Sequence, residues 1–197
     1  MPRLIDLSPA EKSSDPFDFF YGENAVPVEL ATELLIWFET SAPWHLTKAS
    51  FYEQFEFSLL EAKLPSSINP LCSTKTLLRL RNDVGKLFGA SLIEEVEVTA
   101  HKLVRGQGIR IHNDFIAGRE THRLLLQFNR EWSQEDGGLL MLFKSPEAES
   151  VQRIFPPLHR LAFGFAISPC SHHAVSSVKR GERFTLVYSF YETDSQS

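Results

Sequence analysis

Cysteine, long apolar runs and excess positive charge are all scarce in this chain of 197 residues, and each scarcity excludes a class of protein. The two cysteines, Cys72 and Cys170, lie far apart and form no C-x-x-C pair, so a disulfide framework is not expected. No apolar stretch approaches about 18 residues, the length of a membrane-spanning helix, and the N-terminus lacks the apolar core of a signal peptide. We therefore expect a cytoplasmic protein with no membrane partner.

The net charge of −5 disfavours the wrapping of a phosphate backbone, so nucleic acid is not an expected partner. A hydrophobic fraction of 43%, with 16 phenylalanines, is typical of a folded globular chain. No repeat or low-complexity segment divides the sequence. We expect one domain over residues 1–197, with 1–90 as a mostly helical support and 91–191 as the core that carries the site. Nothing in the sequence predicts an oligomeric state.

Apolar residues recur at helical spacing in three segments before residue 90. These segments are 28–38, 51–62 and 73–88, and Gly89 follows the last of them as a stop signal. Residues 8–18, rich in Ser, Pro and Asp, predict a loop or a mobile arm. We expect the three helices to pack on one face of a sheet.

After residue 90 the pattern changes to short alternating runs joined by turns. Strands are expected over 92–104, 109–114, 121–129, 138–143, 160–167 and 182–191. Repeated short strands of this kind indicate a barrel or a double-sheet jelly roll. The predicted fold class is therefore mainly β, a double-stranded β-helix with N-terminal helices packed on one sheet (α+β).

His112 and Asp114 form the most informative pair of residues. Residues two apart on a strand point to the same face, so the strand 109–114 would set an imidazole beside a carboxylate. A histidine from a distant strand, His172 or His173, would complete two His and one carboxylate. That set leaves coordination positions open, as in non-haem Fe(II) oxygenases.

Arg183 suggests how a second ligand would be held. On the strand 182–191, alternation places Arg183, Thr185 and Val187 on one face and an apolar set that includes Phe184 and Tyr188 on the other. If the apolar face packs under the helices, Arg183 points into the barrel. An unpaired buried charge costs several kcal/mol, so the guanidinium would need an anion there.

Longer motifs resemble those of the prolyl-hydroxylase branch of the 2-oxoglutarate oxygenases. Residues 171–186 read SHHAVSSVKRGERFTL and resemble the family ending S-x-H-x-V…V-x-x-G-x-R-x-S/T-L, in which the H-x-V spacing selects His173. Residues 123–132, RLLLQFNREW, and 136–142, DGGLLML, resemble the family's strand, L-N-x-x-W turn and G-G-x-L strand. The resemblance covers about residues 100–191, roughly half of the chain.

The resemblance implies a dioxygenase that uses Fe(II), 2-oxoglutarate and O2, hydroxylates an unactivated C–H bond and releases succinate and CO2. It leaves ascorbate open as an auxiliary reductant. It implies that His112, Asp114 and His173 hold the iron and that Arg183 anchors the C5 carboxylate of 2-oxoglutarate. The other residues expected at the co-substrate are Thr185, Leu125, Leu140 and Gln127, the last standing where the family's oxygen sensors carry a tyrosine.

The substrate is inferred from the same branch, which implies a residue within a peptide, or a free amino acid. The more specific hypothesis is the tailoring of a ribosomally made peptide, including cyclophane-bearing ones. The residues expected at the mouth are Arg110, Arg119, Arg123 and His172, and these arginines would suit an acidic group or a C-terminal carboxylate. The alternatives are a small-molecule hydroxylase and, from another class, a non-catalytic metal-binding jelly roll that acts as a sensor or interaction module.

Overall fold

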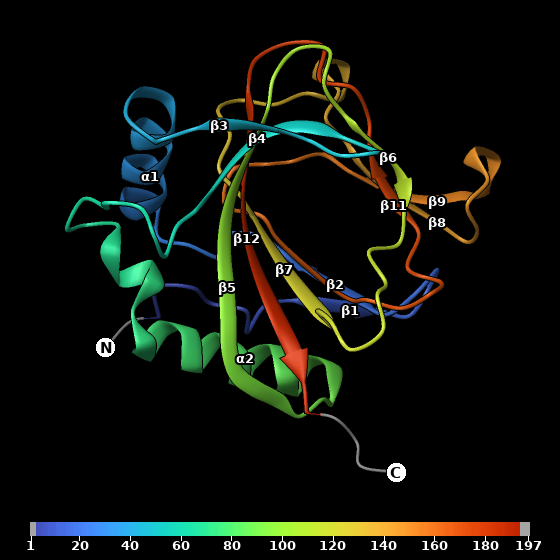
Figure 1. Ribbon diagram of the computed structural model, residues 1–197, viewed down its shortest axis with the longest axis horizontal. Coiled ribbons are helices and arrows are strands. Elements are labelled where there is room, and N and C mark those ends of the chain that lie inside the picture. The colour runs from blue at the N-terminus through green and yellow to red at the C-terminus, as the bar shows by residue number, and fades with distance from the viewer. Residues whose placement is uncertain (1–2, 194–197) are drawn as a thin grey trace.

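Two antiparallel sheets face each other, and both long helices lie beyond the larger one, away from the smaller (Figure 1). The computed structural model describes residues 3–193. The larger sheet has eight strands in the order β1-β2-β10-β7-β12-β5-β4-β3, and the smaller has four in the order β6-β11-β8-β9. This arrangement confirms the predicted mainly β jelly roll with helices on one sheet.

The strands of the larger sheet are, in spatial order, β1 (Glu11–Ser13), β2 (Phe19–Gly22), β10 (Ala162–Ala166), β7 (His122–Gln127), β12 (Arg183–Glu192), β5 (Leu92–Leu103), β4 (Glu53–Ser58) and β3 (His45–Lys48). Those of the smaller sheet are β6 (Ile109–His112), β11 (His173–Val175), β8 (Leu140–Phe143) and β9 (Val151–Phe155). The helices are α1 (Val28–Thr40) and α2 (Thr74–Phe88), with short 3-10 turns η1 (Asn69–Cys72), η2 (Gln134–Asp136) and η3 (Ala148–Ser150).

Two of the three predicted helices are confirmed. Helix α2 begins after Ser73, whose side chain accepts a hydrogen bond from the Thr76 N–H, and ends at Gly89, whose φ of 71° is left-handed. Helix α1 covers the first predicted segment and ends at Thr40. Within residues 3–193, neither helix is long and apolar enough to cross a membrane.

The predicted helix 51–62 is wrong. This segment forms strand β4, which pairs with β3 on one side and β5 on the other. Residues 8–18 also contain an edge strand, β1, where a loop was expected. The first ninety residues therefore extend the larger sheet by four strands as well as supporting it, and the expectation of a mostly helical support is corrected.

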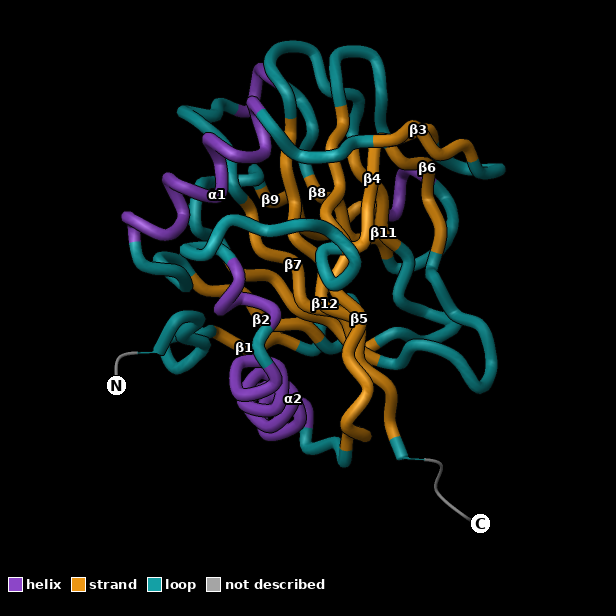
Figure 2. The backbone as a smooth tube through the Cα atoms, turned by 60° about the vertical axis from the view of Figure 1, so that its left-hand side comes forward, coloured by secondary structure: helices purple, strands orange, loops and turns teal. Residues whose placement is uncertain are grey.

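The apolar core lies between the larger sheet and the helices (Figure 2). Phe184 of β12 stacks on Phe38 of α1 with ring centroids 5.7 Å apart, and Leu186 and Tyr188 are fully buried on the same side. A second apolar cluster fills part of the space between the two sheets. The predicted division of β12 into an apolar face and a face toward the barrel interior is thus confirmed.

Gly164 of β10 allows the closest packing in this core. A Cβ atom there would collide with the ring of Phe20, which is fully buried and has no room to withdraw. We expect Gly164→Ala to lower the free energy of unfolding by about 1–3 kcal/mol, the usual penalty for overpacking. Denaturant titration measures this change, and an unchanged unfolding midpoint would contradict the packing described.

Candidate metal centre and adjoining cavity

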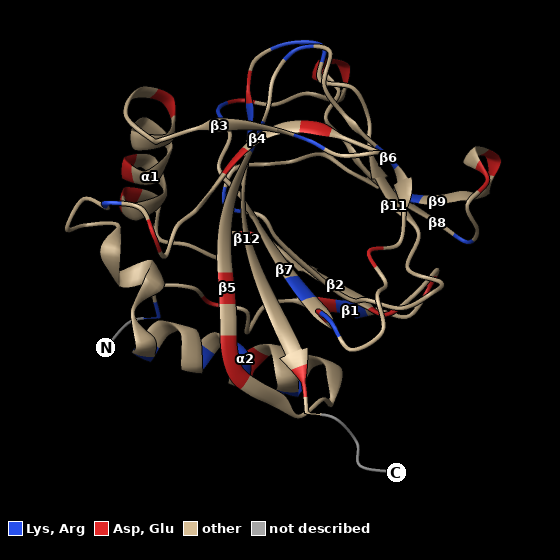
Figure 3. Ribbon diagram, viewed as in Figure 1, with Lys and Arg blue, Asp and Glu red and all other residues tan. Residues whose placement is uncertain are grey.

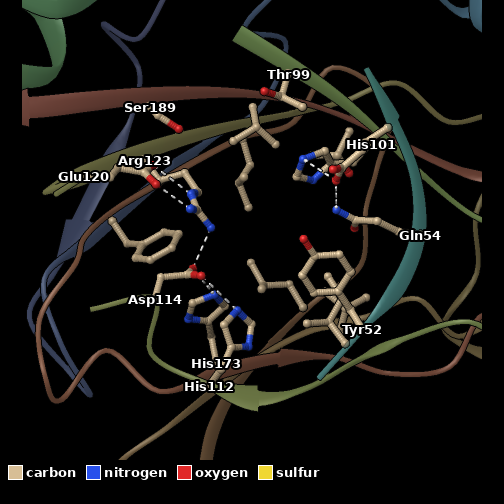
Figure 4. Close-up of a pocket in the computed structure, with 18 of the residues that line it drawn as sticks. Tyr52, Gln54, Thr99, His101, His112, Asp114, Glu120, Arg123, His173 and Ser189 are labelled. Atoms are coloured by element: carbon tan, nitrogen blue, oxygen red, sulfur yellow. Dashed lines mark hydrogen bonds and ion pairs between the residues drawn. The ribbon is translucent and has the colours of Figure 1, made fainter. Parts of the chain in front are cut away.

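A cavity of about 320 Å³ lies between the two sheets (Figure 4). The larger sheet lines it with the inward residues of β4, β5, β7, β10 and β12, and the smaller sheet with residues of β6, β8 and β11. The predicted site residues that line it are His112, Asp114, His173, Arg183, Thr185, Leu125, Leu140 and Arg123.

Three side chains converge on one wall of this cavity. His112 is the last residue of β6 and His173 the first of β11, and the two are paired across the smaller sheet. The Nε2 atoms of His112 and His173 lie 3.3 and 3.1 Å from the two carboxylate oxygens of Asp114. One ligand atom from each residue falls within 4.8 Å of the others, so the three are placed to hold one ion.

The reason for this convergence differs from the one predicted. Strand β6 ends at His112, and Asp114 lies beyond it with a φ of 59°, so strand alternation does not bring the two side chains together. Instead the chain turns back through Asn113, whose side-chain amide donates to the Pro169 carbonyl and whose carbonyl accepts from the Ser171 hydroxyl. A left-handed turn anchored to the distant loop before β11 therefore presents the carboxylate.

Both histidines are held with Nε2 free to bind a metal. The Nδ1 atoms of His112 and His173 lie 2.8 Å from the carbonyls of Arg110 and Ser171, and because a carbonyl only accepts, each Nδ1 must carry the proton. Burial lowers the pKa of His173, which keeps its imidazole neutral. Two nitrogen lone pairs thus face a carboxylate, an arrangement that needs a cation and fits the two-His, one-carboxylate set of Fe(II) oxygenases.

Arg123 lies beside this centre rather than at the mouth where it was expected. Its Nη1 donates to Asp114 at 2.6 Å, and its Nε donates to Glu120 at 2.9 Å. Burial alone would raise the pKa of Asp114, but the positive charge of Arg123 holds it well below its usual range. Arg123 therefore occupies one carboxylate oxygen of Asp114 and leaves the other for a metal.

We expect Arg123→Met to lower turnover about 10- to 100-fold at saturating iron, as partners of metal ligands usually do when removed. Without Arg123, Asp114 is free to offer both oxygens and block an open coordination position. Arg153→Met is the matched control, because Arg153 is exposed and does not line the cavity. Equal activities of the two variants would contradict this role for Arg123.

Arg183 is buried on the cavity wall without an anion. It is 4% exposed, its Nη1 donates to the Thr185 hydroxyl at 2.8 Å, and its Nε finds no hydrogen-bond partner among residues 3–193. Burial lowers its pKa to about 10, and no carboxylate of the described chain lies within 4.0 Å to offset that burial. A guanidinium in this state fits the expected 2-oxoglutarate carboxylate, which would accept the unmade hydrogen bonds.

Gln127 contacts Thr185 instead of the cavity where the co-substrate was expected to bind. Its side-chain oxygen accepts a hydrogen bond of 2.9 Å from the Thr185 hydroxyl, and Gln127 itself does not line the cavity. The Thr185 hydroxyl therefore donates a hydrogen bond to Gln127 and accepts one from Arg183. The two residues together orient the guanidinium, and direct contact of Gln127 with the co-substrate stays a prediction.

The other residues expected at the mouth lie elsewhere. Arg110 turns away and donates to the carbonyl of Ser50, Arg119 is exposed, and His172 is half-buried outside the cavity. Their contact with a substrate stays a prediction. The cavity residues that sequence reasoning missed include Tyr52, Gln54, Glu56, Thr99, His101 and Glu120. The alternation Gln54-Phe55-Glu56-Phe57 was the one signal that could have shown a strand with a polar inner face.

Comparisons with known proteins agree with this geometry. The family model described as 2OG-Fe(II) oxygenase superfamily matches residues 98–190. A Pseudomonas putida prolyl-4-hydroxylase superposes with a TM-score of 0.73 at 18% identity, over 89% of this chain and 92% of that one. A Trichoplax adhaerens prolyl hydroxylase, solved with a hypoxia-inducible-factor peptide fragment, gives 0.72 at 13% identity, over 88% and 83%.

A viral collagen prolyl hydroxylase from Paramecium bursaria Chlorella virus-1, solved as its 2OG complex, gives a TM-score of 0.62 at 11% identity, over 89% and 96%. No curated protein matches the sequence. At these identities the structural likeness shows the fold alone, which is a jelly roll.

The family match over residues 98–190, which contain the His112–Asp114–His173 set, identifies a 2OG-Fe(II) oxygenase domain in this chain. It is a 2-oxoglutarate-dependent dioxygenase whose cofactors are Fe(II), 2-oxoglutarate and O2.

Proposed function

We propose that this oxygenase hydroxylates an unactivated C–H bond of a residue within a peptide. The observation that carries the proposal is that one cavity holds both the three metal-binding side chains and the unpaired Arg183, with further polar wall beyond them. A peptide side chain can enter such a cavity while the rest of the peptide stays outside.

The protein's part in the reaction is to position and to shield. Bound Fe(II) and 2-oxoglutarate supply the activation of O2, with succinate and CO2 as by-products. His112, Asp114 and His173 would hold the iron, and Arg183, fixed by Thr185 and Gln127, would orient the co-substrate. Apolar side chains such as Leu125, Leu140 and Val187 line the space between them and exclude water.

A peptide is favoured over a free amino acid by two considerations. The Trichoplax hydroxylase of the same fold was solved with a peptide fragment. The cavity volume of about 320 Å³ is at the lower end of the range for ligand pockets, so it suits one side chain together with the co-substrate.

Mass spectrometry of reaction products tests the proposal. The protein is incubated with Fe(II), 2-oxoglutarate and ascorbate, and with short peptides or free amino acids in parallel. We expect one oxygen atom to be added to one peptide residue, with succinate formed in step. Oxidation of a free amino acid with every peptide untouched would favour the small-molecule alternative.

Ribosomal-peptide tailoring is the more specific form of the proposal. It predicts a gene for a short precursor peptide beside the gene for this protein, and hydroxylation of that precursor before its leader is removed. A precursor that is left unmodified while unrelated peptides are oxidised would contradict it.

A further inference from the structure

The cavity wall formed by β4 and β5 carries acceptor groups that the metal centre and Arg183 do not use. Gln54 donates from its amide nitrogen to Glu56 at 2.8 Å, and His101 lies 3.9 Å from the same carboxylate. Figure 4 shows Gln54 and His101 across the open cavity from Arg123 and Glu120. This wall, Gln54, Glu56 and His101, is called the β4–β5 wall below.

Glu56 has no cationic partner. Within the described residues, no lysine or arginine nitrogen lies within 4.0 Å of it, and its side chain is 22% exposed. Burial lowers the pKa of His101 to about 4, so the neighbouring imidazole is neutral near pH 7 and does not balance the carboxylate. The acidic character continues along β5 to Glu97, which is exposed at the outer end of the cavity (Figure 3 shows the acidic segments of β4 and β5).

Both basic side chains of the cavity already have a partner or an assigned ligand. Of the lining residues, only Arg123 and Arg183 are arginine or lysine. Arg123 is bound to Asp114 and Glu120. Arg183 lies on β12, next to β5, and donates to Thr185; the proposed function assigns it the co-substrate. The charge on Glu56 is therefore left for something that enters the cavity.

Gln54 provides an independent observation. It is 3% exposed, and its side-chain oxygen has no donor anywhere in residues 3–193. The amide is held in this orientation because its nitrogen serves Glu56, so exchange of the two amide atoms would set oxygen against carboxylate. A buried acceptor without a donor is unfavourable in a folded protein and marks a place where a ligand donor would be gained.

We propose that the β4–β5 wall is a subsite for a cationic group of the substrate, the ammonium or guanidinium of a lysine or arginine side chain in a peptide. Such a group supplies the positive partner that the Glu56 carboxylate lacks and the N–H donor that the Gln54 side-chain oxygen lacks. The subsite rests on the proposed peptide hydroxylase and names its substrate class. It replaces the acidic substrate group that the arginines of the sequence had suggested.

2-Oxoglutarate carries two carboxylates, and the charge of Glu56 repels them. Glu56 therefore favours a cation over a second anion at the β4–β5 wall.

Binding measured by calorimetry tests the subsite. The protein is loaded with Mn(II) and 2-oxoglutarate under argon and titrated with pentaglycine whose central residue is replaced by arginine, citrulline, lysine, norleucine or glutamate. We expect arginine and lysine peptides to bind about tenfold or more tightly than their neutral counterparts, as a hydrogen bond to a charged group implies. Glu56→Gln should remove most of that preference.

Glu53→Gln is the matched control, because Glu53 lies on the same strand, pairs with Lys48 and does not line the cavity. It should leave the preference intact. Equal binding of arginine and citrulline peptides by the wild-type protein, or no binding of either cationic peptide, overturns the subsite even if Glu56→Gln fails to fold. Turnover of neutral peptides alone would overturn the subsite and keep the hydroxylase, whereas cation-selective binding without any peptide oxidation would keep the subsite and overturn the hydroxylase.

Discussion

His173→Ala is expected to reduce turnover to below about one thousandth of the wild-type value. Removal of one of three metal ligands forfeits several kcal/mol of metal-dependent stabilisation of the transition state, and each 1.4 kcal/mol is a factor of about ten. Coupled 2-oxoglutarate decarboxylation measures the loss. His172→Ala is the matched control when 2-oxoglutarate decarboxylation is measured without a peptide, because His172 lies outside the cavity and should retain that turnover. The reverse result would show that the neighbouring histidine is the ligand.

Asp114→Asn and His112→Ala should be equally inactive. Asparagine is preferred to alanine at position 114 because it tolerates the φ of 59°, so the backbone turn is kept while the charged ligand is lost. Circular dichroism should show unchanged secondary structure, since the cores of the two sheets do not depend on these side chains. Full activity in Asp114→Asn would contradict the metal assignment.

Arg183→Ala is expected to weaken 2-oxoglutarate binding about 100-fold or more. A guanidinium makes two charged hydrogen bonds to a carboxylate, each worth about 1.5–3 kcal/mol, and every 1.4 kcal/mol is about tenfold in affinity. Arg183→Lys should recover only part of the affinity, because a point charge does not reproduce the planar fork. Titration of 2-oxoglutarate against the metal-loaded variants measures the effect.

Gln127→Leu should have a smaller effect on 2-oxoglutarate binding than Arg183→Ala. The reason is that it removes the acceptor of the Thr185 hydroxyl while Arg183 remains. Metal binding should be almost unchanged in both variants. Unchanged 2-oxoglutarate affinity in Arg183→Ala would rule out the anchor.

The residues that sequence reasoning placed well are those whose signal is local and periodic. Alternation along β12 separates Arg183 and Thr185 from Phe184 and Leu186, and the structure shows that division, because one side is covered by helices and the other borders the cavity. The end of helix α2 was predicted because Gly89 is a recognisable stop signal, and the structure adds that Ser73, where the predicted segment begins, caps the helix.

Strand β4 was missed because its inner face is polar. A half-buried strand is normally recognised by apolar residues on its inner side, but Gln54 and Glu56 face a cavity rather than a core. The segment carried enough leucine and phenylalanine outside this alternation to resemble a helix.

Arg123 was misplaced for a different reason. The sequence of β7 does not indicate that the Arg123 guanidinium reaches Asp114. This contact depends on a left-handed turn at Asp114 that is fixed by the loop containing Pro169 and Ser171. Contacts set by pairing between distant loops have no periodic trace in a sequence. The metal ligands were nevertheless predicted, since the motif names the residues even where the assumed strand geometry was wrong.

The alternation of β12 also bears on how such an enzyme can change in evolution. Val187 and Ser189 border the cavity, whereas Leu186, Tyr188 and Phe190 lie in the core beneath the helices. Because neighbouring residues face opposite sides, replacement of a cavity residue leaves the helix-side packing in place. Selection can therefore change the cavity side of this strand at Ser189 while the core beneath the helices is kept, whereas Val187 also packs in the apolar cluster between the sheets.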